Sequence, residues 1–152
     1  MKIKSITSFI SVLCLLLATI SIAAAGELPP PGSKPLSAIL KSVEGQRLGV
    51  ITSTEFDDGL WEVEVCKDST CHKLYIDPKA GEEKRRREAG NENELPPANA
   101  KPLAAIVQSI EDNKTGIVTE AEFDDGFWEV ELRKDGRKTK LNIDPRTGET
   151  KR

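Results

Sequence analysis

Glutamates recur along two segments of the sequence, spaced so that their carboxylates would gather on one surface. The segment Glu55–Glu64, which carries Asp58-Gly59 at its centre, returns almost unchanged as Glu122–Glu131. Acidic and apolar residues alternate on both sides of Asp-Gly, a pattern typical of a hairpin with one buried and one solvated face. Such carboxylates could bind a divalent cation or a basic peptide. The simpler interpretation is a solvated sheet surface.

The tight Asp-Gly turn predicts which residues of the two strands face each other. The expected core pairs are Phe56 with Trp61 and Phe123 with Trp128. The expected pairs of like charge are Glu55 with Glu62, Glu122 with Glu129 and Glu120 with Glu131. No calcium-loop spacing surrounds Asp57-Asp58, so turn formation explains these aspartates better. The candidate binding residues are therefore Asp58, Gly59, Asp125, Gly126, Glu55, Glu62, Glu120, Glu122, Glu129 and Glu131.

Two cysteines flank a second predicted turn at Asp68-Ser69. A two-residue turn places Cys66 and Cys71 opposite each other in a non-hydrogen-bonded pair, where side chains approach most closely. We expect them to form a disulfide of about 2 kcal/mol. A metal site that includes His72 is the alternative, but strand alternation places His72 on the opposite face.

The sequence contains no recognisable catalytic motif. It holds one histidine, no glycine-rich phosphate loop and no Gly-x-Ser-x-Gly motif. Its paired carboxylates belong to an open sheet face with no sign of a cleft. We therefore expect no enzymatic activity, no cofactor and no bound metal.

A duplication organises the chain, since a shift of 67 residues aligns Glu27–Arg85 with Glu94–Arg152 without a gap. Apolar residues at helical spacing from Leu36 to Val43 predict a helix after each proline-rich leader. Three strands follow, and the third ends at Asp-Pro. We expect the first strand to direct Val50, Thr52, Thr54 and Phe56 to one side. The predicted α+β fold has two tandem units, each an amphipathic helix packed on a three-stranded antiparallel β-meander.

Residues 1–25 have the features of a secretory signal peptide, with Lys2 and Lys4 before an apolar run and small residues up to Ala25. Residues 26–85 and 94–152 then form the two units, and the polar residues 86–93 a charged linker. The arginines at its start could contact an acidic surface, although a solvated linker is the simpler interpretation. Units of about 55 residues bury little core, so we expect them to pack on each other or on a partner.

Cleavage near Ala25 would place the mature chain in the periplasm or outside the cell, with no membrane span. Loss of Lys2 and Lys4 takes the formal net charge from −3 to about −5. This balance argues against nucleic acid as a partner. The oligomeric state is not determined by the sequence.

The order of helix and strands, and the closing segments Ile76–Glu82 and Ile143–Glu149, resemble the PepSY domain, the peptidase propeptide and YpeB-type domain. The resemblance covers both copies. It implies a non-catalytic module, of a kind often proposed to inhibit or chaperone peptidases in the cell envelope, and it carries no active-site residues. We therefore expect an exported protein that binds another protein, plausibly a peptidase, through an edge strand or the hairpin turns. The alternative is an accessory that binds a cation or an envelope component through the acidic face.

Overall fold

The computed structural model describes residues 27–90 and 94–151, which form two α-helices and seven β-strands. The first unit consists of α1 (Leu36–Gly45), β1 (Val50–Asp57), β2 (Leu60–Lys67), β3 (Thr70–Ile76) and β4 (Glu83–Ala89). The second unit consists of α2 (Leu103–Asp112), β5 (Ile117–Asp124), β6 (Phe127–Lys134) and β7 (Arg137–Ile143). The predicted signal peptide lies outside the described residues.

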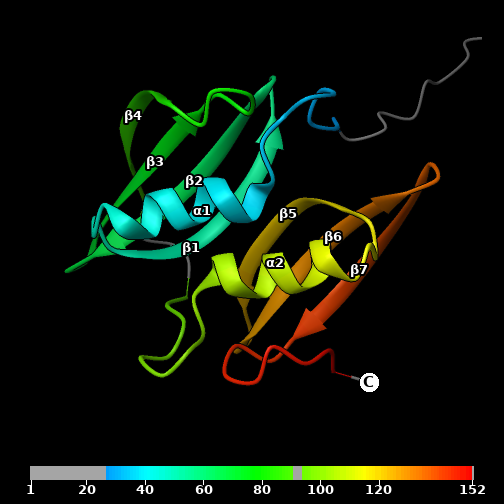
Figure 1. Ribbon diagram of the computed structural model, residues 1–152. Coiled ribbons are helices and arrows are strands. Elements are labelled where there is room, and N and C mark those ends of the chain that lie inside the picture. Colours follow the sequence, from blue (N-terminus) through cyan, green and yellow to red (C-terminus); the bar gives the residue numbers. More distant parts are fainter. Residues whose placement is uncertain (1–26, 91–93, 152) are drawn as a thin grey trace, which may run out of the picture.

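All seven strands belong to one antiparallel sheet in the order β4-β3-β2-β1-β5-β6-β7. The two units meet where β1 pairs with β5, with Thr54 opposite Ala121 and Glu55 opposite Glu120. Both helices lie side by side on one face of this sheet (Figure 1). The predicted α+β class with two helix-and-meander units is confirmed, and the two units do pack on each other.

One segment differs from its prediction, because the strand β4 occupies part of the expected linker. Residues 86–89 pair with β3, and only 91–93 of the expected linker lie outside the described part of the chain. The guanidinium carbon of Arg85 lies 3.8 Å from the centre of the Tyr75 ring. Main-chain hydrogen bonds and this stacking hold β4 on the edge of the sheet, although β4 has almost no apolar side chains. The first unit therefore has four strands and the second has three.

The predicted hairpin turns are present. Asp58 and Gly59 have φ values of 48° and 77°, as the mirror-image type I′ turn requires. Phe56 lies opposite Trp61 with ring centroids 5.2 Å apart in an edge-to-face arrangement. The equivalent pair of Phe123 and Trp128 has centroids 5.4 Å apart. All four rings are buried and belong to the hydrophobic core.

The start of the first strand departs from simple alternation. The register of β1 against β2 shifts between Ile51 and Ser53, so Ile51 enters the core and Val50 stays 47% exposed. Thr52 consequently turns to the other face, where its hydroxyl donates to Glu64 at 3.2 Å. The expectation that Val50 and Thr52 share a face with Phe56 is wrong, because a bulge places two residues opposite one. A matching shift occurs in β5.

Each helix receives its N-terminal cap from the other helix. Both begin after a proline and have no side-chain cap of their own. The Glu44 carboxylate of α1 accepts a hydrogen bond from the Ala104 N–H at 3.1 Å, and Glu111 of α2 accepts from the Ser37 N–H at 3.3 Å. Glu44 and Glu111 occupy the same position in the repeat, so the exchange is isologous, like the contacts of a twofold dimer. The negative charge also complements the positive helix end.

Replacing either capping glutamate should weaken the whole fold. Glu44→Ala and Glu111→Ala should each lower the free energy of unfolding by about 1 kcal/mol, because each leaves N-terminal N–H groups without an acceptor. Urea unfolding of the chain measures this loss. Asp112→Ala, at an exposed neighbouring residue of α2, is the matched control and should stay near wild type. Equal stability of Glu44→Ala and Asp112→Ala would contradict the capping role.

Candidate functional site

The face of the sheet turned away from the helices carries glutamates from both units. The three predicted pairs are present: Glu55 with Glu62, Glu122 with Glu129 and Glu120 with Glu131. The β1–β5 pairing adds a contact that no sequence pattern predicts, because Glu55 also lies opposite Glu120 of the other unit. The two predicted acidic strips therefore merge into one surface, which we call the acidic seam (Glu55, Glu62, Glu120, Glu122, Glu129 and Glu131).

A shallow hollow of about 230 Å³ lies at the centre of the acidic seam. Glu55 and Glu62 of the first unit and Glu120 and Glu122 of the second unit line it, together with Lys73. No single unit supplies all of these side chains. The hollow therefore exists only because the two copies share one sheet.

Cations neutralise the flanks of the acidic seam more than its centre. Lys73 bonds to Glu62 at 2.8 Å, and Lys140 lies 3.5 Å from Glu129. Glu131, which is buried, pairs with Lys138 and also with Arg133 at 3.4 Å. Within residues 27–90 and 94–151, no lysine or arginine lies within ion-pair distance of the central Glu55.

The central carboxyl groups are harder to ionise than an exposed glutamate. Burial raises the pKa of Glu55 above 4.5, and the negative charges of Asp57 and Glu62 raise it further. Burial also raises the pKa of Glu120, followed by the charges of Glu55 and Glu131. The charge of Glu55 thus raises the pKa of Glu120, and the charge of Glu122 raises the pKa of Glu55, so the effect acts across the boundary between the units.

The two predicted turns do not form a single site with the acidic seam. Asp58-Gly59 and Asp125-Gly126 are exposed, but β1 and β5 are antiparallel, so the turns lie at opposite ends of the sheet. The Gly59 N–H donates to the Glu27 carboxylate at 3.0 Å, which ties one turn to the leader of its own unit. The turns and the acidic seam are therefore separate candidate contacts.

The cysteines form the predicted disulfide. Cys66 and Cys71 are bonded, with Cα atoms 4.1 Å apart, and both are buried on the outer face. Their sulfurs are therefore not free to bind a metal with His72. The Glu64 carboxylate lies beside the disulfide and is buried. Strand alternation predicts that Glu64 lies on the outer face, but nothing in the charge pattern indicates that it is buried.

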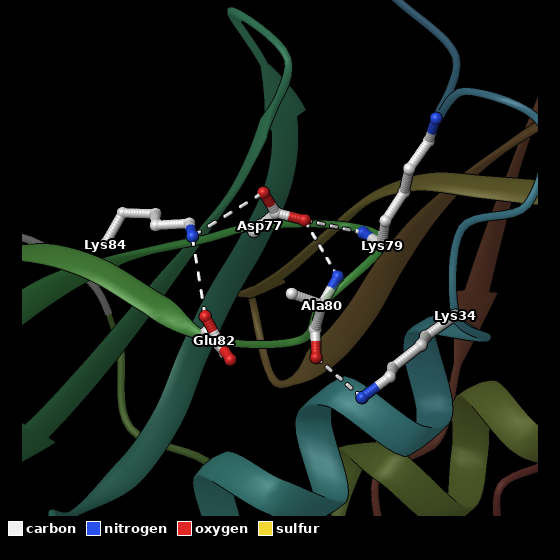
Figure 2. A network of polar contacts seen from close by, with 6 residues as sticks. All are labelled: Lys34, Asp77, Lys79, Ala80, Glu82 and Lys84. Atoms are coloured by element: carbon white, nitrogen blue, oxygen red, sulfur yellow. Dashed lines mark hydrogen bonds and ion pairs between the residues drawn. The ribbon is translucent and has the colours of Figure 1, made fainter.

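The Asp-Pro motif that closes each unit has a structural role, drawn for the first unit in Figure 2. The Asp77 carboxylate accepts hydrogen bonds from the N–H groups of Lys79 and Ala80 at 2.9 and 2.8 Å, which lowers its pKa. Lys34 of the leader donates to the Ala80 carbonyl at 2.6 Å. The turn thus anchors the leader to the end of β3, with Lys84 on its other side.

The second unit repeats the same turn. Asp144 accepts from the N–H groups of Arg146 and Thr147 at 2.8 and 2.9 Å, and Lys101 donates to the Thr147 carbonyl. These contacts explain why the two closing segments are nearly identical without assigning them a ligand.

A comparison with family models matches the chain in two segments. The model of the peptidase propeptide and YPEB domain matches residues 7–86 and again 89–152. The chain belongs to this family. Each unit is therefore a peptidase-propeptide-like PepSY module, and the two modules share one sheet.

Other comparisons add little beyond this. A crystal structure of a provisionally assigned lipoprotein from Clostridium difficile 630 is similar with a TM-score of 0.46 and 16% identity. The similarity covers 84% of this chain and 97% of that one. No curated protein matches the chain. Over residues 27–90 and 94–151, neither helix has the length and apolar content that a membrane crossing requires.

Neutralising a central glutamate should stabilise the fold at neutral pH. Because the pKa of Glu120 is raised in the folded chain, its ionisation costs folding energy once the pH exceeds about 4.5. Glu120→Gln should therefore raise the free energy of unfolding near pH 7, by under about 1 kcal/mol since solvent reaches the group. The gain should vanish below about pH 4, where Glu120 is protonated in both states.

Thermal unfolding at the two pH values measures this difference. The matched control is Glu129→Gln, which removes the partner of Lys140 and should bring no gain. A stabilisation by Glu120→Gln that is equal at both pH values would contradict the role of charge.

Proposed function

We propose that this protein is an exported, non-catalytic module that binds and restrains a peptidase of the cell envelope. The observation that carries the proposal is the match of both units to the peptidase propeptide and YPEB domain. A propeptide domain acts by occupying a surface of its enzyme, which needs a rigid scaffold and no reactive groups of its own.

The shape of the scaffold supports such a role. One continuous sheet presents an open face and two edges, while both helices cover the opposite face. Extended segments of a partner can pair with the edge of such a sheet, and exposed turns can enter a cleft. The exposed turns are Asp58-Gly59 and Asp125-Gly126.

The residues on the outer face support binding better than catalysis. The one histidine of the sequence, His72, alternates to the helix side of β3 opposite Val65, away from the acidic seam. The glutamates there lie in a shallow hollow and not in a deep cleft. This arrangement suits recognition of a surface by charge.

Capture from an envelope extract, followed by an inhibition assay, tests the proposal. The chain from Gly26 to Arg152 should retain a peptidase, identified by mass spectrometry, and should inhibit the purified enzyme with saturating stoichiometry. An unrelated exported protein of similar size and net charge is the control for non-specific retention. The proposal fails if no peptidase is retained with or without a chelator, or if the retained enzyme keeps full activity at saturating inhibitor.

A second candidate function is binding of a divalent cation or an envelope component by the acidic seam. The specific observation in its favour is the pairing of Glu55 with Glu120, which brings carboxylates of both units around one hollow. Oxygen ligands from carboxylates are those that calcium prefers. Such an accessory would hold its two units together more firmly when the cation is present.

Calcium titration of the melting temperature tests this second candidate. Binding to the folded state alone should add about 2.7 kcal/mol of stability at one hundred times the Kd. The double variant Glu55→Gln with Glu120→Gln should lose this calcium-dependent gain. Glu82→Gln with Glu149→Gln, at equivalent exposed positions outside the seam, should keep it. No calcium effect on the wild-type chain would remove this candidate.

A further inference from the structure

The two edges of the sheet are not equivalent. In the first unit, β4 pairs along the outer edge of β3 from Cys71 to Ile76. In the second unit β7 holds the position of β3, but the described residues cover its outer edge at one end only. There, Thr150 bridges to Ile143, and the Lys151 N–H donates to the Asn142 carbonyl at 2.7 Å. Among the described residues, no strand lies on the outer side of the stretch from Lys138 to Leu141.

The main-chain groups along this stretch are oriented for pairing. The two-residue turn at Asp135-Gly136 makes Thr139 and Leu141 exchange hydrogen bonds with β6. The N–H and C=O groups of Lys138 and Lys140 therefore point away from β6. Their equivalents in the first unit, Cys71 and Lys73, lie opposite residues of β4.

The side chains confirm that a covering strand is missing here. Leu74 is fully buried, with Arg86 of β4 opposite it, whereas its equivalent Leu141 is only partly buried. The core of the second unit is thus left open along one edge. An apolar side chain on an added strand would close it.

Charge determines what could occupy this edge. The side chains of Lys138 and Lys140 lie on the outer-face side, where they pair with Glu131 and Glu129 of β6, and they remain 49% and 56% exposed. A second copy of the chain would bring its own β7 lysines, or the arginines of its β4, against them. Like charges on opposing strands are destabilising, so the edge favours an acidic strand and disfavours self-association.

We infer that β7 is a docking edge for an extended antiparallel segment of a partner protein, with acidic residues beside Lys138 and Lys140 and an apolar residue beside Leu141. This inference rests on the proposed function and identifies the surface that performs it. The partner segment takes the place that β4 holds in the first unit. Main-chain hydrogen bonds supply affinity, and the two lysines select the sequence.

An NMR experiment on the ¹⁵N-labelled chain from Gly26 to Arg152 tests the inference. The probe is a seven-residue peptide that alternates glutamate with valine. In the free protein the amides of Lys138 and Lys140 should exchange rapidly with solvent, whereas those of Lys73 and Tyr75 should be protected. Peptide addition should shift the Lys138 and Lys140 resonances and protect their amides. Protection in the free protein would show that the chain already fills this edge and would overturn the inference.

Two variants test the edge without disturbing its pairing to β6. Lys140→Pro removes an N–H that points outward, a position where an edge strand tolerates proline, and should weaken peptide binding about tenfold. Lys140→Thr keeps the N–H but removes the charged side chain, and it should weaken binding about threefold. The matched control is Arg86→Pro, which removes an outward N–H from the opposite edge, β4, and should leave the affinity unchanged. Circular dichroism establishes that each variant is folded.

Other outcomes would overturn the inference. Equal binding of a peptide with lysine in place of glutamate would contradict the charge selection. Equal binding of an acidic peptide interrupted by proline would show attraction by charge alone. Resonance shifts confined to β4 or to the acidic seam would place the contact elsewhere.

The inference and the proposed function fail in distinguishable ways. If a captured peptidase is inhibited equally by the wild-type chain and by Lys140→Pro, the proposed function stands and the docking edge is wrong. If the peptide binds β7 as described but no peptidase is retained, the docking edge stands and the peptidase role is wrong.

Discussion

The pairing of β1 with β5 is the interaction on which the rest of the structure depends. Each unit of about 55 residues can bury only a small core by itself. The shared sheet and the two adjacent helices give both units one continuous core, from Leu36 through to Ile143. The helices then exchange caps through Glu44 and Glu111, so neither helix has a satisfied N-terminus without the other unit. Folding of one copy is thereby coupled to folding of its neighbour.

The same pairing gathers acidic side chains of both units on the outer face of the sheet. Antiparallel alignment of two copies of one acidic hairpin necessarily brings their glutamates together, and Glu55 meets Glu120 across the boundary. Lysines on β3 and β7 neutralise the flanks, but the centre keeps its raised pKa values. The β1–β5 pairing thus stabilises the fold through main-chain hydrogen bonds and the shared core, whereas repulsion between the outer glutamates destabilises it. A basic segment or a cation bound there would relieve this repulsion.

The two copies are close in sequence, yet over the described residues the two units differ at the edges of the sheet. The first unit has the disulfide and the additional strand β4. The second has Arg133 and Lys138 in place of the cysteines, and its edge strand is exposed. The anchoring turns at Asp77 and Asp144 and the aromatic pairs are retained in both. The parts that hold a PepSY module together are therefore common to both copies, and the two units differ mainly at the outer strands.

Local patterns in the sequence were sufficient for much of the fold. The two-residue turns at Asp58-Gly59 and Asp68-Ser69 set the registers that pair Phe56 with Trp61 and Cys66 with Cys71, because such a turn leaves no freedom in the alignment of its strands. The helical spacing of apolar residues identified both helices. The closing Asp-Pro motifs identified the family. Each of these features depends on residues close together in the chain.

Only the tertiary structure decided how distant segments meet. Alternation could not reveal the bulge after Ile51, because one extra residue changes the face without changing the composition. The charged strand β4 has no apolar pattern, and its stability comes from main-chain pairing and from Arg85 against Tyr75. The β1–β5 alignment, which sets the acidic seam and the exchanged caps, joins residues 65 to 69 positions apart, with several other elements between them. No local rule fixes such a register, so it depends on the packing of the whole core.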